Sequence, residues 1–217
     1  MLRRQAMKRS VLFLFGLLTM VPFAGQNSTS VASAQAALSG AKKDAKILVA
    51  YFSRADENYG VGFVEKGNTQ IIAEYIADYL KVDSFQIRTV TPYPKNYREC
   101  TNVALEEQKK KARPALAEQI GNLKDYDIIF LGYPNWWGDL PMAVYTFLES
   151  NDFSGKTIIP FCTHAGSGLS NTVKTIASKC PRATVLNGFA MSGQTAQNSQ
   201  VAAKRDTLKW IDGIKLK

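Results

Sequence analysis

The sequence has one histidine and three cysteines, and these shortages exclude several kinds of protein. With a single histidine and no C-x-x-C pair, the chain offers no His/Cys cluster for a metal ion. The cysteines, Cys100, Cys162 and Cys180, can form one disulfide at most, so no disulfide framework holds the chain together. We therefore expect a fold that depends on a hydrophobic core, which a chain of this length can build.

Extended basic patches are also lacking. Lys109-Lys110-Lys111 form a basic run shortly after Glu106-Glu107, a pattern that favours a solvated helix face over a nucleic-acid surface. No nucleic-acid-binding motif accompanies this run. Nucleic acid is therefore not an expected partner.

Several enzyme motifs are absent as well. Gly60-Val61-Gly62 is followed by Glu65 where a dinucleotide fingerprint needs glycine, and no phosphate-loop motif occurs. None of the cysteines begins the C-x5-R motif of a phosphatase, and Tyr133-Pro134 stands where a response regulator carries its aspartate. Ser167 lacks the G-x-S-x-G elbow. A hydrolase that uses Ser167 and His164 remains an alternative.

The N-terminal segment has the pattern of an export signal. A basic start precedes an apolar stretch over 11–24 and small residues at 32–36, which is typical of a signal peptide with its cleavage site. We expect a signal over 1–34, a linker over 35–45 and one domain over 46–217, in the periplasm or outside the cell. An uncleaved membrane anchor is the alternative, although the apolar stretch is short for a membrane span.

Two export routes are compatible with this segment. Arg3-Arg4 resembles the twin-arginine signal, whose route carries folded proteins, whereas a signal that begins at Met7 would export an unfolded chain. Without residues 1–34 the chain keeps 23 basic and 18 acidic side chains, a net charge of +5. The mature domain is therefore mildly basic.

Five apolar or β-rich stretches predict a sheet. Three have the continuous apolar pattern of strands buried on both faces, and two weaker stretches predict outer strands. The buried strands are expected at Lys46–Ser53, Asp127–Pro134 and Lys156–Thr163, and the outer strands at Asp83–Val90 and Ala183–Ala190.

Helical patterns alternate with these strands. Apolar residues at one-face spacing predict helices from about Asn68, from Met142, around Val173 and over 198–214. This alternation predicts an α/β fold with an open, doubly wound parallel sheet between two helical layers. Ligands of such sheets bind beyond the carboxyl ends of the strands. The segments that follow the strands are therefore the expected functional site.

The segment after the first strand suits a phosphate group. Ser53 ends this strand, and Gly67-Asn68-Thr69 opens the next helix after a detour over 54–66. Free N–H groups at a helix N-terminus bind phosphate well, and Ser53 and Thr69 add hydroxyl groups. The alternative is that Asn68 or Thr69 only caps the helix.

Two further strand ends carry unusual loops. After the third strand, Gly132 and Pro134 are expected to make a turn that displays Trp136 and Trp137. After the fourth strand, the glycines of 163–168 allow a flat or phosphorylated ligand to approach the backbone. A phosphate site, an aromatic wall and a glycine-rich floor are thus expected in one crevice.

With these segments in this order, the chain resembles the flavodoxin-like family of FMN-binding domains, particularly its single-domain bacterial branch with paired tryptophans. The resemblance rests on ILVAYFS, GNTQIIAEYIA, ARPAL, YDIIFLGYPNWWGDLP and PFCTHAGSG, and it covers residues 46–193. It implies a sheet in the order 2-1-3-4-5, with FMN held without a covalent bond where the strand order reverses.

The resemblance also implies which residues bind the cofactor. They form three groups, which would hold the phosphate, line the isoalloxazine ring and close its other side. In that order the groups are Ser53, Arg54, Gly67, Asn68 and Thr69; Pro134, Asn135, Trp136, Trp137 and Gly138; and Thr163, His164, Ala165, Gly166 and Ser167. No separate catalytic residue is expected, because the flavin itself carries the redox chemistry.

The chain departs from short flavodoxins in the insertion over 54–66 and in its basic charge. A basic domain favours a two-electron reductase or an acidic redox partner. The sequence thus predicts an exported FMN protein that transfers electrons to a partner protein or reduces small acceptors such as quinones. The alternative is a non-catalytic flavin-binding or protein-interaction module that uses the loop of Trp136 and Trp137.

Overall fold

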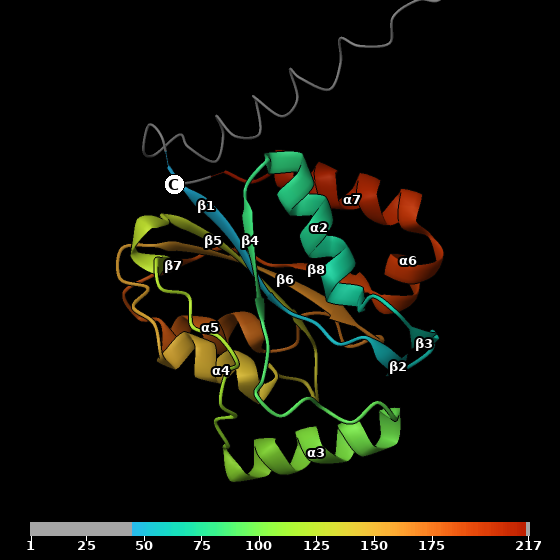
Figure 1. Cartoon of the computed structure of the whole chain (residues 1–217). Helices are drawn as coiled ribbons and strands as arrows, with labels where there is room; N and C mark the ends of the chain where they lie inside the picture. The colour runs from blue at the N-terminus through green and yellow to red at the C-terminus, as the bar shows by residue number, and fades with distance from the viewer. Residues whose placement is uncertain (1–44, 216–217) are drawn as a thin grey trace, which may run out of the picture.

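The computed structural model describes residues 45–215 (Figure 1). The expected export signal over 1–34, with nearly all of the expected linker, lies outside the described residues. Within them, none of the helices combines the length and the apolar character that a membrane crossing needs.

A parallel sheet forms the centre of the molecule, and its strand order is β4-β1-β5-β6-β7, with β8 also paired to β6. The expected 2-1-3-4-5 order and the doubly wound fold are confirmed. The strands are β1 (Ile47–Phe52), β4 (Asp83–Ile87), β5 (Ile128–Pro134), β6 (Thr157–His164), β7 (Thr184–Val185) and β8 (Phe189–Ser192).

The fifth predicted strand is split into β7 and β8, and Pro160 of β6 explains the break. Ile158 pairs with Val185 and Phe161 pairs with Phe189, so the outer strand holds one extra residue between these pairs. Leu186 N–H donates a hydrogen bond to Ile158 O. The next hydrogen bond between the two strands would have to be donated by the backbone N–H of residue 160. Proline has no N–H, so the ladder is interrupted there and the outer strand bulges.

Helices cover both faces of the sheet (Figure 1). One face carries α2, α6 and α7, and the other carries α4 and α5, while α3 lies beyond α4 and also contacts β2. A short 3-10 helix, η1, precedes β5. The bounds are α2 (Asn68–Leu80), α3 (Tyr97–Lys110), η1 (Leu123–Asp125), α4 (Met142–Glu149), α5 (Thr172–Lys179), α6 (Gly193–Asn198) and α7 (Gln200–Asp212).

The central strand β1 divides the core into two halves. Leu48 and Phe52 pack in the hydrophobic cluster under α4 and α5, whereas Val49 and Tyr51 pack in the cluster under α2 and α7. Alternate residues of a strand point to opposite faces, so burial on both sides produces the continuous apolar run seen in the sequence.

The expectation that Gly132 makes a turn is wrong. Gly132 lies inside β5, between Tyr51 of β1 and Phe161 of β6. A Cβ atom at this position would overlap the ring of Phe161. Gly132 is therefore required for close packing in the middle of the sheet. Pro134, also expected to make the turn, is the last residue of β5 and pairs with Thr163, so the turn comes later in the chain.

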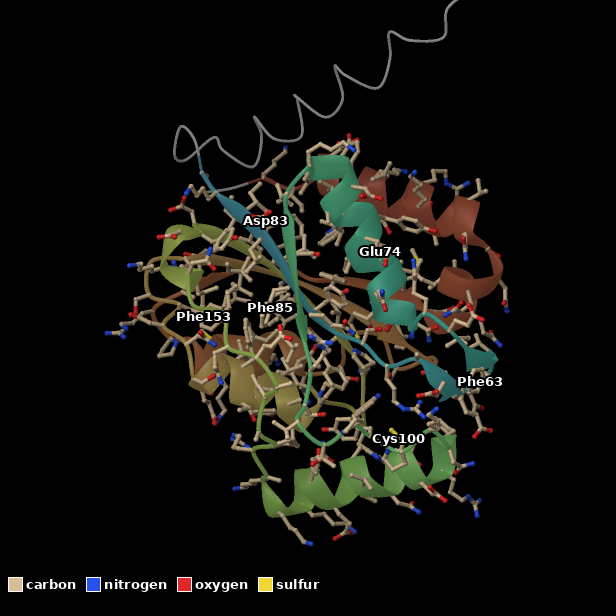
Figure 2. The ribbon with its side chains drawn as sticks, in the orientation of Figure 1. Phe63, Glu74, Asp83, Phe85, Cys100 and Phe153 are labelled. Carbon is tan, nitrogen blue, oxygen red and sulfur yellow. The ribbon has the colours of Figure 1, made fainter. Side chains whose placement is uncertain are left out.

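The insertion over 54–66 forms an antiparallel hairpin of β2 (Asp56–Asn58) and β3 (Gly62–Val64). It projects from the end of β1 toward the start of α3 (Figure 1). Phe63 lies at the outer edge of the hairpin, and Cys100 lies on the side of α3 that faces the rest of the domain (Figure 2). The hairpin and α3 thus stand together at the carboxyl edge of the sheet.

Candidate functional site

A cleft of about 420 Å³ opens at the carboxyl ends of β1, β5, β6 and β8. This is the edge at which parallel α/β sheets bind their ligands. Of the fifteen residues expected to bind cofactor, the ones that line this cleft are Arg54, Asn68, Pro134, Asn135, Trp136, Trp137, Thr163, His164, Ala165 and Gly166. The others, Ser53, Gly67, Thr69, Gly138 and Ser167, lie next to these residues in the chain and outside the lining.

Ser53 shapes the start of α2. Its Oγ accepts a hydrogen bond from Gln70 N–H at 3.0 Å, which leaves the Ser53 O–H as a donor. A Cβ atom at Gly67 would overlap Ser53 Oγ and Arg54 O, so only glycine fits beneath this contact. The N–H groups of Asn68 and Thr69 precede the first intrahelical bonds, where a helix offers free donors.

Asn68 is not the cap of α2, so the capping alternative is wrong. Gly67 is the N-cap residue and makes no side-chain cap bond, and the helix begins at Asn68. The Asn68 side chain instead accepts a hydrogen bond at 2.9 Å from Gln197, whose amide also donates to Lys66 O. The start of α2 is therefore held from the side of α6.

Arg54 reaches the cleft wall, but its guanidinium is bound to backbone carbonyls. It donates to Glu57 O within the hairpin and to Pro94 O and Lys95 O before α3. The ammonium of Lys66 pairs with Glu74. In this structure Arg54 therefore ties the hairpin to α3 and does not present a free charge to a phosphate.

The turn after β5 is formed by Trp136, Trp137, Gly138 and Asp139. Trp136 and Asp139 exchange two backbone hydrogen bonds of 3.0 Å each. Trp137 and Gly138 have φ values of +54° and +79°, the pattern of a type I′ turn. Asn135 supports this turn, because its side chain accepts from Gly138 N–H and donates to Gly168 O of the neighbouring loop.

The two tryptophans have different roles in the wall. Trp136 packs edge-on against Phe52 and Tyr93, with ring centroids 5.4 and 5.0 Å away. Trp137 is 53% exposed, and its indole N–H donates to Thr101 O of α3 at 3.0 Å. Trp136 is thus anchored in the core, while Trp137 is displayed at the mouth of the cleft.

His164, at the end of β6, also lines the cleft. Gly166 N–H donates to its Nδ1 at 2.9 Å, so the neutral imidazole carries its proton on Nε2. Burial lowers the pKa of His164, which favours this neutral form at pH 7. The bond goes to Gly166 and not to the hydroxyl of Ser167, so the geometry lacks the nucleophile–base pair that a hydrolase needs.

A buried hydroxyl pair joins two parts of the site. Thr69 Oγ1 and Thr163 Oγ1 lie 2.7 Å apart, and both side chains are almost completely buried. This contact fixes the start of α2 against the end of β6. The two residues therefore contribute to the site as supports for the cleft.

The cleft lining also includes residues that the sequence did not predict. The additional residues are Asn58, Tyr59, Tyr97, Cys100, Thr101, Ala104, Ser192, Gly193 and Gln194. Ser192 ends β8, and Gly193 and Gln194 follow it, so the rule that ligands bind at the carboxyl ends of strands would have found these three. The hairpin and α3 residues carry no such signal, because only the tertiary arrangement brings them to the cleft.

Burial makes the three cysteines poor nucleophiles. All three are buried and free of disulfides. Burial raises the pKa of Cys100, that of Cys162 to about 12 and that of Cys180 to about 11. The reactive thiolate form is therefore scarce at neutral pH.

Comparisons with known proteins agree with this architecture. A scan against protein families matches residues 46–212 to flavodoxin. Among solved structures, a provisionally identified flavoprotein of Bacteroides uniformis is 30% identical, with a TM-score of 0.60, and the match covers 78% of this chain and 99% of that one. A second such flavoprotein, of Bacteroides eggerthii, is 28% identical with a TM-score of 0.57, and the match covers 74% of this chain and 98% of that one.

A more distant structure shares the fold. A Lactobacillus acidophilus flavoprotein, crystallised in complex with FMN, is 19% identical with a TM-score of 0.55, and the match covers 71% of this chain and 97% of that one. A search of curated proteins found no match. The family match spans most of the chain and includes every strand of the central sheet. The chain belongs to the flavodoxin family.

Proposed function

We propose that the cleft binds FMN and that the protein is an exported flavoprotein, which transfers electrons or reduces small acceptors such as quinones. One observation carries the proposal: the start of α2, the tryptophan turn and the loop after β6 border a single cleft. Each suits a different part of a flavin mononucleotide. Membership of the flavodoxin family and the FMN complex of the Lactobacillus acidophilus protein support it further.

The residues at the start of α2 suit the phosphate. The hydroxyl of Ser53 and the N–H groups of Asn68 and Thr69 would donate to its oxygens, and the positive end of the helix dipole would favour its charge. Gly193 lies so close to Asn68 that a Cβ atom would overlap the amide. A side chain at position 193 would therefore displace Asn68, which this proposal places at the phosphate.

The tryptophan turn and the loop after β6 suit the ring system. Trp136 and Trp137 would offer flat surfaces, and His164 would offer its Nε2–H as a hydrogen-bond donor. No aspartate or glutamate stands among the described residues of the lining, so an anionic ligand meets no carboxylate there. When bound, FMN would supply the redox chemistry, and the protein would bind, orient and shield it.

Titration of the apoprotein with FMN tests the proposal. We expect one saturable site with a dissociation constant of about 1 µM or tighter, equivalent to about −8 kcal/mol. Replacing both Trp136 and Trp137 by alanine should weaken binding by at least about tenfold, since stacking on an aromatic ring contributes about 1–3 kcal/mol. Phe63→Ala is the matched control, because Phe63 is 69% exposed but does not line the cleft.

An interaction module that uses the same turn is the second candidate. The 53% exposure of Trp137 favours it, since exposed aromatic side chains often mark interfaces. If the double tryptophan variant keeps its FMN affinity, the turn serves a partner and not the flavin. The proposal also assigns the chain to the paired-tryptophan branch of the family, and the adjacent Trp136 and Trp137 support this assignment.

The export component of the proposal rests on residues 1–34. N-terminal sequencing of the protein from its native cells should give a mature chain that begins near residue 35. Substituting both Arg3 and Arg4 by lysine should block export if the twin-arginine route is used and should leave it unchanged if the signal begins at Met7. An intact N-terminus on a cytoplasmic protein would refute export.

A further inference from the structure

Three exposed aromatic side chains surround the mouth of the cleft, and we call them the aromatic rim. Tyr59 of the hairpin is 63% exposed, Tyr97 of α3 is 36% exposed and Trp137 of the turn is 53% exposed. All three also line the cleft. The rings of Tyr59 and Tyr97 lie 5.9 Å apart at an angle of 44°. The rim thus combines three separate segments of the chain.

Two of the three rim residues contribute little apolar burial to the fold. Apolar surface stabilises a protein in proportion to the area removed from water, and Tyr59 and Trp137 keep more than half of their surface in water. Trp137 also has a φ of +54°, in the left-handed region that costs a non-glycine residue about 1–2 kcal/mol. Strain of this kind is retained mainly at functional sites. Folding alone therefore does not explain the rim.

The rim is nevertheless held firmly in place. The carboxylate of Glu57 accepts hydrogen bonds from Tyr97 N–H at 2.9 Å and from the Asn96 amide at 3.0 Å. Arg54 ties the hairpin to the carbonyls of Pro94 and Lys95. These contacts couple the hairpin to the first turn of α3. The insertion therefore fixes Tyr59 and Tyr97 beside each other.

The chemistry of the rim points to an uncharged, flat ligand. The cleft lining around it offers Arg54 and His164 as its basic side chains, but the Arg54 guanidinium is bound to carbonyls and His164 is neutral at pH 7. Within residues 45–215 the hydroxyl groups of Tyr59 and Tyr97 have no hydrogen-bond partner. They can donate to a carbonyl oxygen of a ligand whose ring stacks on the rim.

We propose that the aromatic rim is a second binding site in the cleft, which takes a flat, uncharged conjugated diketone of the quinone class beside the flavin. This inference rests on the proposed function, since the quinone would lie next to bound FMN. The insertion over 54–66 then determines which acceptor the protein accepts. The rings supply stacking, and the two phenol hydroxyls supply donors for the quinone oxygens.

Isothermal titration of the oxidised, FMN-loaded protein with duroquinone tests the site. Duroquinone carries no free ring position, so it does not add to thiols such as Cys100. We expect saturable binding to the wild type and about tenfold weaker binding to Tyr59→Leu and to Tyr97→Leu, which keep apolar bulk but lose the flat ring. The saturated analogue 1,4-cyclohexanedione should show no saturable binding to any of these proteins.

Two controls make the outcome specific. Tyr59→Phe and Tyr97→Phe keep the flat ring and should bind duroquinone more tightly than the leucine variants, while Phe63→Leu on the same hairpin should match the wild type. FMN affinity, measured first for every variant, reports that each is folded. A wild type without FMN binding would refute the proposed function. FMN binding together with wild-type duroquinone affinity in both leucine variants, or with no duroquinone binding at all, would refute the rim site alone.

Discussion

The indole ring of Trp136 lies edge-on against the phenol ring of Tyr93, with centroids 5.0 Å apart and an interplanar angle of 84°. Behind this contact, the Tyr93 hydroxyl donates to Glu107 of α3 at 2.7 Å. Burial and this hydrogen bond both raise the pKa of Tyr93, which remains a neutral donor at all ordinary pH values. The tryptophan wall of the cleft is therefore supported from α3 through Tyr93.

Substitutions at Tyr93 should separate the ring contact from the hydrogen bond. Tyr93→Phe keeps the ring, so FMN affinity should stay within about twofold, while the free energy of unfolding falls by about 1 kcal/mol because the Glu107 bond is lost. Tyr93→Leu also removes the edge-on contact with Trp136 and should weaken FMN binding by at least about fivefold, a loss of about 1 kcal/mol. Urea unfolding and FMN titration measure the two effects. Equal FMN affinity in both variants would contradict the supporting role.

Gly132 should tolerate no side chain. Gly132→Ala places a methyl group on the ring of Phe161, and we expect a loss of about 3 kcal/mol or more in the free energy of unfolding. Adding Phe161→Leu should recover part of this loss, because the two sites share the same space. Gly121→Ala is the control, since no atom lies within 4 Å of its Cβ position, and it should change stability by less than about 0.5 kcal/mol. A stable Gly132→Ala protein with wild-type urea unfolding would contradict the packing argument.

Trp137 should show a trade-off between stability and binding. Trp137→Asn places a residue that tolerates left-handed backbone before Gly138, so the strain of about 1–2 kcal/mol is relieved while the indole bond to Thr101 is lost. We expect stability equal to or above that of the wild type, with FMN affinity reduced by about tenfold. Trp137→Phe keeps a ring and the strain, and should lose less affinity. Thermal unfolding and FMN titration provide the test, and a strongly destabilised asparagine variant would contradict it.

Glu149 should make stability depend on pH. Hydrogen bonds from Arg113 and Lys179 lower the pKa of this carboxyl to about 2. Since the folded-state pKa is depressed, the stabilisation is complete above the unfolded pKa of about 4.3 and is lost as the pH falls toward 2. Glu149→Gln should therefore be less stable than the wild type at pH 7, with the difference shrinking between pH 4.5 and about 2. Urea unfolding across this range measures the difference.

The exposed pair of Glu118 and Arg88 serves as the control for that experiment. Both side chains are more than half exposed, so the pair contributes little to stability. Glu118→Gln should follow the wild type at every pH. A constant difference between Glu149→Gln and wild type from pH 7 to pH 2 would contradict the role of the Glu149 network.

The fold was predictable because burial on both faces of the sheet leaves continuous apolar runs, such as Ile47–Phe52 and Ile128–Pro134. The break between β7 and β8 depends on a contact across the sheet with Pro160, and local pattern does not report such contacts. Gly132 was misread for the same reason. Its sequence neighbours suggest a turn. Glycine is required there because the ring of Phe161, which is distant in the sequence, occupies the space that a Cβ atom would need.

The residues of the candidate site that lie at the ends of strands were predictable from the sequence, whereas those of the hairpin and α3 were not. Trp136 follows β5 and His164 ends β6. The rule that ligands bind at the carboxyl ends of parallel strands therefore predicted both. Tyr59 and Tyr97 reach the cleft only because Glu57 and Arg54 join the hairpin to α3. Arg54 itself looked like a phosphate ligand from its position after Ser53, but the carbonyls that bind it come from a segment forty residues later.

The visible absorption spectrum of the protein purified from its native cells tests the central claim most directly. We predict the two absorption bands of bound flavin, released as FMN on denaturation, which bleach on reduction with dithionite and return in air. The same spectrum should be weak or absent in the double alanine variant of Trp136 and Trp137. A colourless protein that also fails to acquire flavin absorbance after incubation with excess FMN would contradict the account.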